Sequence, residues 1–370
     1  MKNAWPGTMK PLDLTGLLTI DKEEAEIMRI MITGGLGFIG SHMVRYLLDT
    51  VPDIHINNVD VLTYAGNRAT LSEYETDPRY RWVYASIGDR AQLEPVFADE
   101  PIDCVINFAA ESHVDRSIVS GTPFVATNVL GTQVLLELAR QYYVPRFVQV
   151  STDEVYGSLG TEGWFSETSP LNPSSPYAAS KAAADLLTLA AFRTYGQDVV
   201  ITRCSNNYGP YQFPEKLIPL FITNGLEGKP WPLYGDGKNV RDWLFVTDHV
   251  RALWEVARRG QAGQIYNIGG HNEKSNREVA ETLADILHLP ASIITFVADR
   301  LGHDRRYAID AQKITKDLGW APHMDWHQGL RETVKWYRNH EPWWRAVKSG
   351  EYRLYSQQQY GTFRNGLPQS

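Results

Sequence analysis

One glycine-rich turn limits the possible folds of this chain more than any other feature. A short apolar run at residues 29–33 leads into the heptapeptide GGLGFIG at residues 34–40, and an amphipathic helical pattern follows. Gly34, Gly37 and Gly40 permit a tight turn, a close approach of the backbone to a pyrophosphate, and close packing of the helix on a sheet. The N-terminus of such a helix also favours an anion. The turn therefore predicts a dinucleotide-binding loop.

The residue that ends the next apolar run indicates which dinucleotide binds. Asp60 lies twenty residues beyond Gly40. A carboxylate at this place accepts hydrogen bonds from ribose hydroxyls and repels a 2′-phosphate, which favours NAD over NADP. An ordinary glycine turn with a solvent-facing Asp is the alternative, but strand, loop, helix and carboxylate occur together here.

Between residues 28 and 205, short apolar runs alternate with helical patterns. The predicted strands are residues 29–33, 54–60, 82–85, 104–108 and 147–151, and the predicted helices begin at 38 and 90 and lie near 128–142 and 177–189. Apolar runs without period-two alternation indicate strands buried on both faces of a parallel sheet. We therefore expect an α/β fold with a Rossmann-type, doubly wound sheet that binds the cofactor.

The rest of the chain has a different texture. Residues 1–27 show no sustained hydrophobic period, and we interpret them as an N-terminal appendage that could be disordered. The segment could be a true extension of the chain, or translation could start at Met28 instead. Prolines and glycines interrupt short segments after residue 205, which predicts a smaller α/β substrate-binding lobe over residues 206–360. Residues 239–258 are expected to return to the first lobe.

Composition argues against several classes of partner. The 370 residues carry 36 Lys and Arg against 43 Asp and Glu, a net charge of −7, so no basic field attracts nucleic acid. We expect no membrane span, since no run of about eighteen apolar residues occurs. Cys104 and Cys204 lie in apolar runs and are read as reduced, buried thiols of a cytoplasmic protein. The ten histidines form no ligand spacing with carboxylates, so we expect no metal site.

A tyrosine and a lysine one helical turn apart form the first candidate catalytic pair. Tyr177 and Lys181 fall on one face of the predicted helix. A free tyrosine has a pKa of about 10, but a lysine cation and an oxidised nicotinamide would favour the phenolate. Tyr177 would then deprotonate a hydroxyl whose carbon gives hydride to the cofactor. Such pairs are usually surface residues, but the preceding glycine loop favours catalysis.

Two adjacent carboxyl groups form the second candidate pair. Asp153 and Glu154 follow the predicted strand 147–151, at the strand end where α/β sheets bind ligands. The alternative is a solvated pair of loop carboxylates. Catalysis is favoured because the strand end, the Tyr/Lys pair and the cofactor loop all converge on this place. Asp89 either caps the helix that begins at Arg90 or faces an adenine, with capping favoured.

Taken together, these motifs resemble the extended short-chain dehydrogenase/reductases, and among them the dTDP-glucose 4,6-dehydratase family. The matching segments are GGLGFIG at 34–40, AAESHVDR at 109–116, STDEVYG at 151–157, YAASK at 177–181, CSNNYGP at 204–210, FPEK at 213–216, RDW at 241–243 and GHDRRY at 302–307. The similarity runs from residue 28 to about residue 360. Leu36 departs from the family pattern, in which a small Ala is usual.

The resemblance implies a reaction. It implies oxidation of dTDP-glucose at C4 by NAD, loss of water across C5 and C6, and hydride return to C6, which gives dTDP-4-keto-6-deoxyglucose and leaves NAD bound. Asp153 is assigned as the acid, Glu154 as the base and Thr152 as a hydrogen-bond partner near the C4 oxygen. Burial and the Glu154 charge are expected to raise the Asp153 pKa.

The resemblance also implies ligand contacts and an assembly. Cofactor contacts fall on Gly34, Gly37, Phe38, Ile39, Gly40, Asp60, Thr63, Asp89, Ala109, Thr127, Tyr177, Lys181 and Asn207. Substrate contacts fall on Ser112, Thr152, Asn206, Lys216, Arg241, Asn276, His303 and Asp304. A homodimer through the helices near 128–142 and 177–195 is expected.

Three alternatives remain open. One is a 4,6-dehydratase for another nucleotide hexose, such as a UDP-linked one. A 4-epimerase shares the glycine loop and the Tyr/Lys pair but has no need for Asp153 and Glu154. A non-catalytic NAD-binding regulator could lose these residues without penalty, yet all of them are present.

Overall fold

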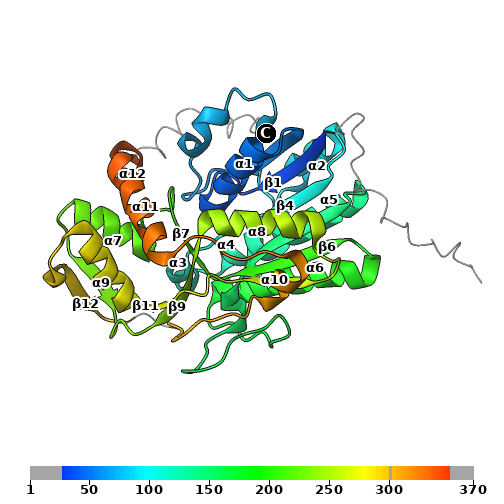
Figure 1. Ribbon diagram of the computed structural model, residues 1–370. Helices are drawn as coiled ribbons and strands as arrows, with labels where there is room; N and C mark the ends of the chain where they lie inside the picture. The colour runs from blue at the N-terminus through cyan, green and yellow to red at the C-terminus, as the bar shows by residue number, and fades with distance from the viewer. Residues whose placement is uncertain (1–26, 300–301, 351–370) are drawn as a thin grey trace, which may run out of the picture.

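The computed structural model describes residues 27–299 and 302–350, and a seven-stranded parallel sheet lies at its centre (Figure 1). The strand order is β10-β6-β5-β4-β1-β2-β3. The strands are β1 Met28–Thr33, β2 Ile54–Asp60, β3 Tyr80–Tyr84, β4 Cys104–Asn107, β5 Arg146–Thr152, β6 Val199–Cys204 and β10 Ile265–Ile268. The order reverses between β1 and β4, where open α/β sheets bind ligands. The predicted α/β, Rossmann-type fold is confirmed.

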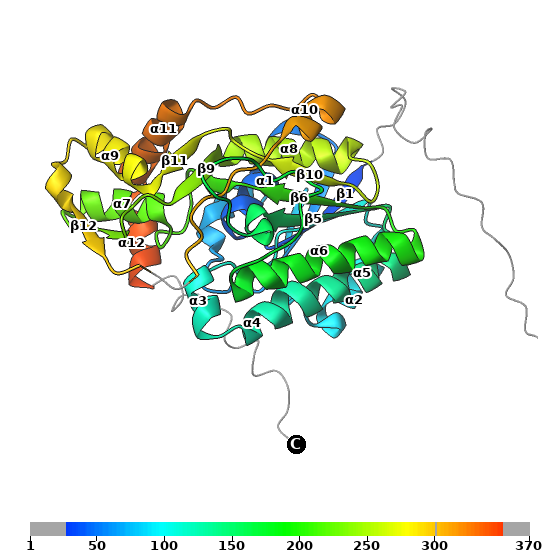
Figure 2. The same cartoon turned by 90° about the horizontal axis from the view of Figure 1, so that it is seen from below.

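Helices cover both faces of this sheet, which explains why the strands show no period-two pattern. One face carries α1 (Phe38–Thr50), α8 (Val246–Arg259) and α10 (Gln312–Leu318), and the other carries α2 (Arg90–Asp99), α5 (Thr132–Gln141) and α6 (Pro176–Tyr195), as Figure 2 shows. Ile30 and Ile32 of β1 pack with α1 and α8, whereas Met31 packs with α2 and α5. Successive residues of one strand therefore point into two different apolar cores, so all three of these residues are apolar.

Two helices differ from their predicted limits. The helix predicted near 128–142 is α5, which begins at Thr132; a π-helical turn (Val125–Gly131) precedes it and follows the short α4 (Thr122–Phe124). The helix predicted for 177–189 runs on as α6 to Tyr195, because Gly196 ends it in the left-handed conformation at φ +68°. Ser175 caps the start of α6, where its side chain accepts from the Ala178 amide.

A second, smaller lobe is built on its own apolar core. It contains the three-stranded sheet β11-β9-β7 and the pair β12-β8, packed with four helices. The strands are β7 Asn206–Tyr208, β8 Trp231–Tyr234, β9 Val240–Phe245, β11 Glu273–Ser275 and β12 Ile294–Val297. The helices are α7 Leu217–Leu226, α9 Asn276–Leu287, α11 Trp326–Asn339 and α12 Glu341–Ser349.

The chain crosses between the lobes after β9. It continues into α8, which packs on α1, and then into β10, which pairs with β6 of the large sheet. The lobe limits given from the sequence stay predictions, and the N-terminal appendage, up to residue 26, and residues 351–360 lie outside the described part. Within that part, no helix is long and apolar enough to cross a membrane.

A buried ion pair joins α6 to β6, and its loss should destabilise the large lobe. Arg203 Nε lies 2.9 Å from Asp185 Oδ2, and both side chains are almost fully buried. We expect Asp185→Asn to lower the free energy of unfolding by about 3 kcal/mol, because it leaves the guanidinium buried without its counter-charge. Urea unfolding measures this loss.

The exposed pair between Arg81 and Asp99, at 2.5 Å, supplies the control. Asp99→Asn should cost about 0.5 kcal/mol or less, because water already solvates both groups. Equal losses in the two variants would contradict the prediction.

Candidate active site

A cavity of about 330 Å³ lies at the carboxyl ends of the central strands and extends to the second lobe. All five predicted catalytic residues line it: Thr152, Asp153, Glu154, Tyr177 and Lys181. So do twelve of the thirteen predicted cofactor residues, namely Gly34, Gly37, Phe38, Ile39, Gly40, Asp60, Thr63, Ala109, Thr127, Tyr177, Lys181 and Asn207. The structure thus brings residues separated by more than 170 positions into one cavity.

The glycine loop leaves no room for side chains at its base. Gly34 has φ +71°, and a Cβ on it would lie 2.7 Å from the Ala109 backbone nitrogen. A Cβ on Gly40 would lie 2.4 Å from the Gly34 carbonyl oxygen. Gly37 is the N-cap of α1 and supplies no side-chain cap, so the helix presents backbone amides beside the cavity. A pyrophosphate fits this loop.

Asp60 is fixed at the end of β2 by backbone amides. Its Oδ2 accepts from the Leu36 amide at 3.0 Å and its Oδ1 from the Leu62 amide at 2.8 Å. Burial raises the pKa of Asp60, while these amides act in the opposite direction. The unusual Leu36 side chain is buried, so the contact to Asp60 needs only its backbone. Together with the loop, this carboxyl suits the ribose of a dinucleotide.

Asp89 is the exception among the predicted cofactor residues. Its Oδ1 accepts from the amides of Ala91, at 3.0 Å, and Gln92, at 3.3 Å, so it caps α2. It is not among the residues that line the cavity. The structure thus shows the capping alternative for Asp89, and the cofactor contact assigned to Asp89 stays a prediction, because both amides bond to Oδ1.

The two adjacent carboxyl groups start a short 3₁₀ turn, Asp153–Tyr156, directly after β5. Thr152 Oγ1 accepts from the Glu154 amide at 3.2 Å and approaches Asp153 Oδ1 at 3.4 Å. Asp153 is 2% exposed, and burial raises its pKa well above the usual range, with the charges of Glu154 and Asp242 adding to the effect. Burial thus favours the neutral form of Asp153, in the direction that a proton-donating acid requires.

The Tyr/Lys pair lies on the first turns of α6, but its electrostatics differ from the expectation. Lys181 Nζ donates to the Val150 carbonyl at 2.7 Å, and burial lowers its pKa, while Asp185 opposes the change. Burial raises the pKa of Tyr177 well above its usual range, and the Glu154 charge adds to this effect. Within the chain alone, burial thus favours the phenol form of Tyr177, whereas the sequence argument for the phenolate also counted an oxidised nicotinamide.

The predicted substrate residues fall into two groups. Ser112, Asn206 and Lys216 line the cavity together with Thr152, and Lys216 Nζ donates across the lobes to the Ser112 carbonyl at 3.2 Å. The other four, which are Arg241, Asn276, His303 and Asp304, are not among its lining residues.

Arg241, Asn276 and Asp304 of this second group belong to one polar cluster, whereas His303 Nδ1 lies 2.6 Å from Asp299 Oδ1. Arg241 donates to the Asp304 carbonyl at 3.0 Å, and Asn239 Nδ2 donates to the same oxygen at 3.1 Å. The Asn276 amide donates to the Asn239 carbonyl at 2.9 Å. The Arg241 charge also acts on the Asp153 pKa, which it lowers. The cluster is therefore electrostatically coupled to the acid at the cavity.

Several cavity residues had no prediction. They include Glu111, Tyr211, Glu215, Trp343 and Val347. Glu111 and Glu215 lie inside the matching segments 109–116 and 213–216, and the local signal for Trp343 and Val347 is their spacing, one turn apart on a C-terminal helix. The described residues contain no cluster of His, Cys, Asp or Glu side chains that could hold a metal ion.

Comparisons with known proteins agree with this geometry. The family model described as "GDP-mannose 4,6 dehydratase" matches residues 31–333. The dTDP-glucose 4,6-dehydratase of Neisseria meningitidis is 53% identical, over 88% of this chain and 98% of that protein. The dTDP-glucose 4,6-dehydratase 1 of Escherichia coli is 50% identical, over 90% and 99%.

Solved structures give the same result. DesIV, a dTDP-glucose 4,6-dehydratase from Streptomyces venezuelae solved with NAD and TYD bound, is 52% identical with a TM-score of 0.84, over 86% of this chain and all of that one. A UDP-glucose 4-epimerase from Thermotoga maritima is 29% identical with a TM-score of 0.79, over 84% and 99%. This chain therefore belongs to the nucleotide-sugar dehydratases that the family model describes, and among them to the dTDP-glucose 4,6-dehydratase family.

Proposed function

We propose that this protein converts dTDP-glucose to dTDP-4-keto-6-deoxyglucose and keeps NAD bound through the cycle. The observation that carries the proposal is the buried acid Asp153 beside Glu154, in one cavity with Tyr177 and Lys181. A 4-epimerase exchanges hydride at one carbon and needs no such acid and base pair. The identity to dehydratases, at about 50%, also exceeds the 29% to the epimerase.

The cavity suits NAD at two places. The backbone of Gly34, Gly37 and the first turn of α1 would hold the pyrophosphate, and Asp60 would hold the adenosine ribose. When bound, NAD takes hydride from C4 of the sugar and returns it to C6, so no external oxidant is consumed. This explains why the cofactor should copurify with the protein.

The chain's own residues move three protons in this scheme. Tyr177 Oη removes the proton of the C4 hydroxyl. The resulting C4 ketone acidifies the C5 proton, which the Glu154 carboxylate removes. Asp153 donates its proton to the departing C6 hydroxyl, which leaves as water, and when hydride returns to C6 the proton taken up by Glu154 returns to C5. Burial raises the pKa of Asp153, which favours its proton-donating form.

Product mass tests the function directly. Purified protein is incubated without added NAD with dTDP-glucose and, separately, with UDP-glucose. We expect the product of dTDP-glucose to be lighter than the substrate by the mass of one water. We also expect kcat/KM to be higher for dTDP-glucose than for UDP-glucose. Faster turnover of UDP-glucose would contradict the proposed thymine preference. A product with the same mass as the substrate would indicate an epimerase. Bound NAD without any product would indicate a non-catalytic regulator.

We further propose a homodimer through α5 and α6. Val125 and Leu130 lie in the π-helical turn before α5, Leu186 lies on the neighbouring α6, and each of the three is more than half exposed. Pairing two copies of this face would bury these side chains. Leu186→Glu should therefore shift the molar mass by light scattering from dimer to monomer, whereas Tyr84→Glu, on edge strand β3, should not. A dimer in Leu186→Glu would contradict this interface.

The two cysteines support a place in the cytoplasm, which we also propose. Cys104 and Cys204 are free and buried. Burial raises the pKa of each thiol to about 12, so both remain protonated and slow to oxidise. Such thiols suit a reducing compartment.

A further inference from the structure

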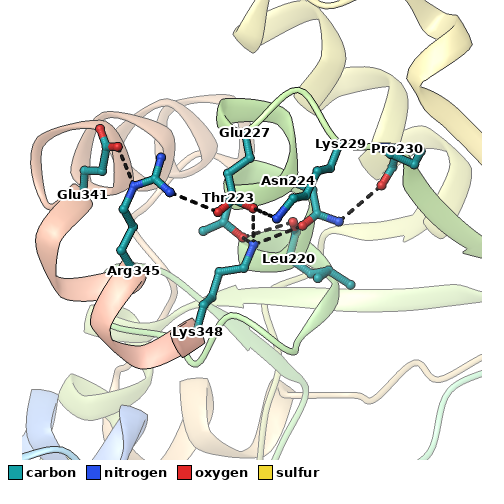
Figure 3. Close-up of polar contacts among 9 residues, drawn as sticks. All are labelled: Leu220, Thr223, Asn224, Glu227, Lys229, Pro230, Glu341, Arg345 and Lys348. Atoms are coloured by element: carbon teal, nitrogen blue, oxygen red, sulfur yellow. Dashed lines mark hydrogen bonds and ion pairs between the residues drawn. The ribbon is translucent and has the colours of Figure 1, made fainter. Parts of the chain in front are cut away.

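The last described helix, α12, presents three faces to three different surroundings. Trp343 and Val347, one turn apart, line the cavity. Trp344 is fully buried in the core of the second lobe. Arg345 and Lys348 lie on a third face and reach toward α7 (Figure 3). Below, Trp343 and Val347 are called the α12 wall.

One carboxylate joins α12 to α7. Glu227 follows the end of α7 and is only 11% exposed. It accepts from Lys348 Nζ at 2.7 Å and from Arg345 at 3.3 Å, both on α12, and from Lys229 Nζ at 2.8 Å (Figure 3). Burial opposes the charge of Glu227, but the two lysines hold its pKa below the usual range.

The same lysine makes two further contacts with α7. Lys348 Nζ lies 3.2 Å from Asn224 Oδ1 and 3.4 Å from Thr223 Oγ1. These neutral groups orient the ammonium, and Glu227 supplies the opposite charge. Because Glu227 is nearly buried, its pairs are screened less by water than an exposed pair would be.

Ring contacts connect the α12 wall to the glycine loop. The ring centroids of Trp343 and Tyr211 lie 5.6 Å apart, those of Tyr211 and His42 lie 6.0 Å apart, and those of His42 and Phe38 lie 5.7 Å apart. Phe38 is the first residue of α1. Tyr211 has φ +62°, a costly conformation for a tyrosine that this packing and the Arg45 guanidinium, 4.5 Å from its ring, maintain.

We propose that Glu227 is a positioning residue for the cofactor, although it is not among the residues that line the cavity. It fixes α12 on α7, and α12 in turn sets the α12 wall beside Tyr211 and the first turns of α1. This inference rests on the proposed function, since NAD is the ligand whose retention the wall controls. Residue Glu227 thereby links a surface ion cluster of the second lobe to the binding loop of the first.

Release of NAD measures the effect. Glu227→Gln keeps the side-chain shape but removes the charge, so Arg345 and Lys348 lose their counter-charge and the α12 wall loosens. We expect NAD to leave the holoenzyme about tenfold faster, measured with an NAD-consuming enzyme as the trap. At saturating NAD, kcat for dTDP-glucose should stay within about twofold of wild type, because Glu227 touches no reacting atom. Glu227→Asp keeps the charge and should retain most of the bound NAD.

Two further variants separate this role from a general loss of stability. Glu341→Gln removes a pair to Arg345 at 2.6 Å inside α12 but leaves Glu227 in place, so NAD release should match wild type. Trp343→Ala removes the wall itself and should also speed release. Adding Glu227→Gln to Trp343→Ala should then change the rate little further, because both substitutions act through one contact.

The outcomes are distinguishable. The positioning role would be overturned if Glu227→Gln released NAD at the wild-type rate. It would also be overturned if the rate increases of Glu227→Gln and Trp343→Ala multiplied in the double variant. In either case, turnover of dTDP-glucose would leave the proposed function intact. A lower thermal midpoint with unchanged NAD release would likewise reduce Glu227 to a structural residue. A wild-type protein that binds no NAD would instead refute the proposed function.

Discussion

Tyr177→Phe should lower kcat for dTDP-glucose by about 10³-fold, one of the two largest effects we expect. The phenol oxygen is the proposed base for the C4 hydroxyl, and phenylalanine fills the same volume without that oxygen. Tyr177 is buried in the cavity, with Thr152 as a hydrogen-bond partner. Because oxidation precedes elimination, neither the product nor exchange of the C5 proton with solvent should be seen.

A second buried tyrosine supplies the matched control. Tyr156 Oη donates to Asn267 Oδ1 at 2.8 Å, away from the cavity lining. Tyr156→Phe should lose about 1 kcal/mol of stability and keep kcat near wild type. Turnover and solvent-deuterium incorporation at C5, followed by mass spectrometry, separate the two variants. Normal C5 exchange in Tyr177→Phe would show that another group removes the C4 hydroxyl proton.

Local sequence signals predicted the cofactor side of the site well, because each of them reflects a local requirement. The conformation at Gly34 and the close contact at Gly40 exclude side chains, so glycine must appear there. Asp60 ends a strand and is fixed by the amide of Leu36, only 24 residues away. Tyr177 and Lys181 share one helix turn, so their spacing alone placed them together.

Long-range packing decided what the sequence did not predict. Trp343 reaches the cavity only because α12 packs on α7, and its ring neighbour Tyr211 is 132 positions away. The expectation for Tyr177 counted a lysine cation and an oxidised nicotinamide, whereas burial, the main cause of its raised pKa, follows from tertiary packing. The helix predicted near 128–142 begins only at Thr132, because a π-helical turn over residues 125–131 carries no signature in amphipathic spacing.

Glu154→Gln should separate oxidation from elimination. Without the carboxylate, the C5 proton stays in place, so formation of the 4-keto-6-deoxy product should fall by about 10³-fold. Tyr177 can still remove the C4 hydroxyl proton, so the absorbance of the reduced nicotinamide should build up and persist after substrate is added. Tyr177→Phe should show neither absorbance nor product. Full turnover by Glu154→Gln would assign the C5 base to another residue.

The same variant should also change the pH dependence of the first step. The Glu154 charge raises the pKa of Tyr177 and of Asp153, after burial as the main cause. Removing that charge lowers both values, so Tyr177 loses its proton at lower pH. The acidic limb of the reduction rate, which needs the Tyr177 phenolate, should therefore move to lower pH in Glu154→Gln. An unchanged limb would mean that the group titrating there is not Tyr177, because Glu154 acts on this phenol through its charge.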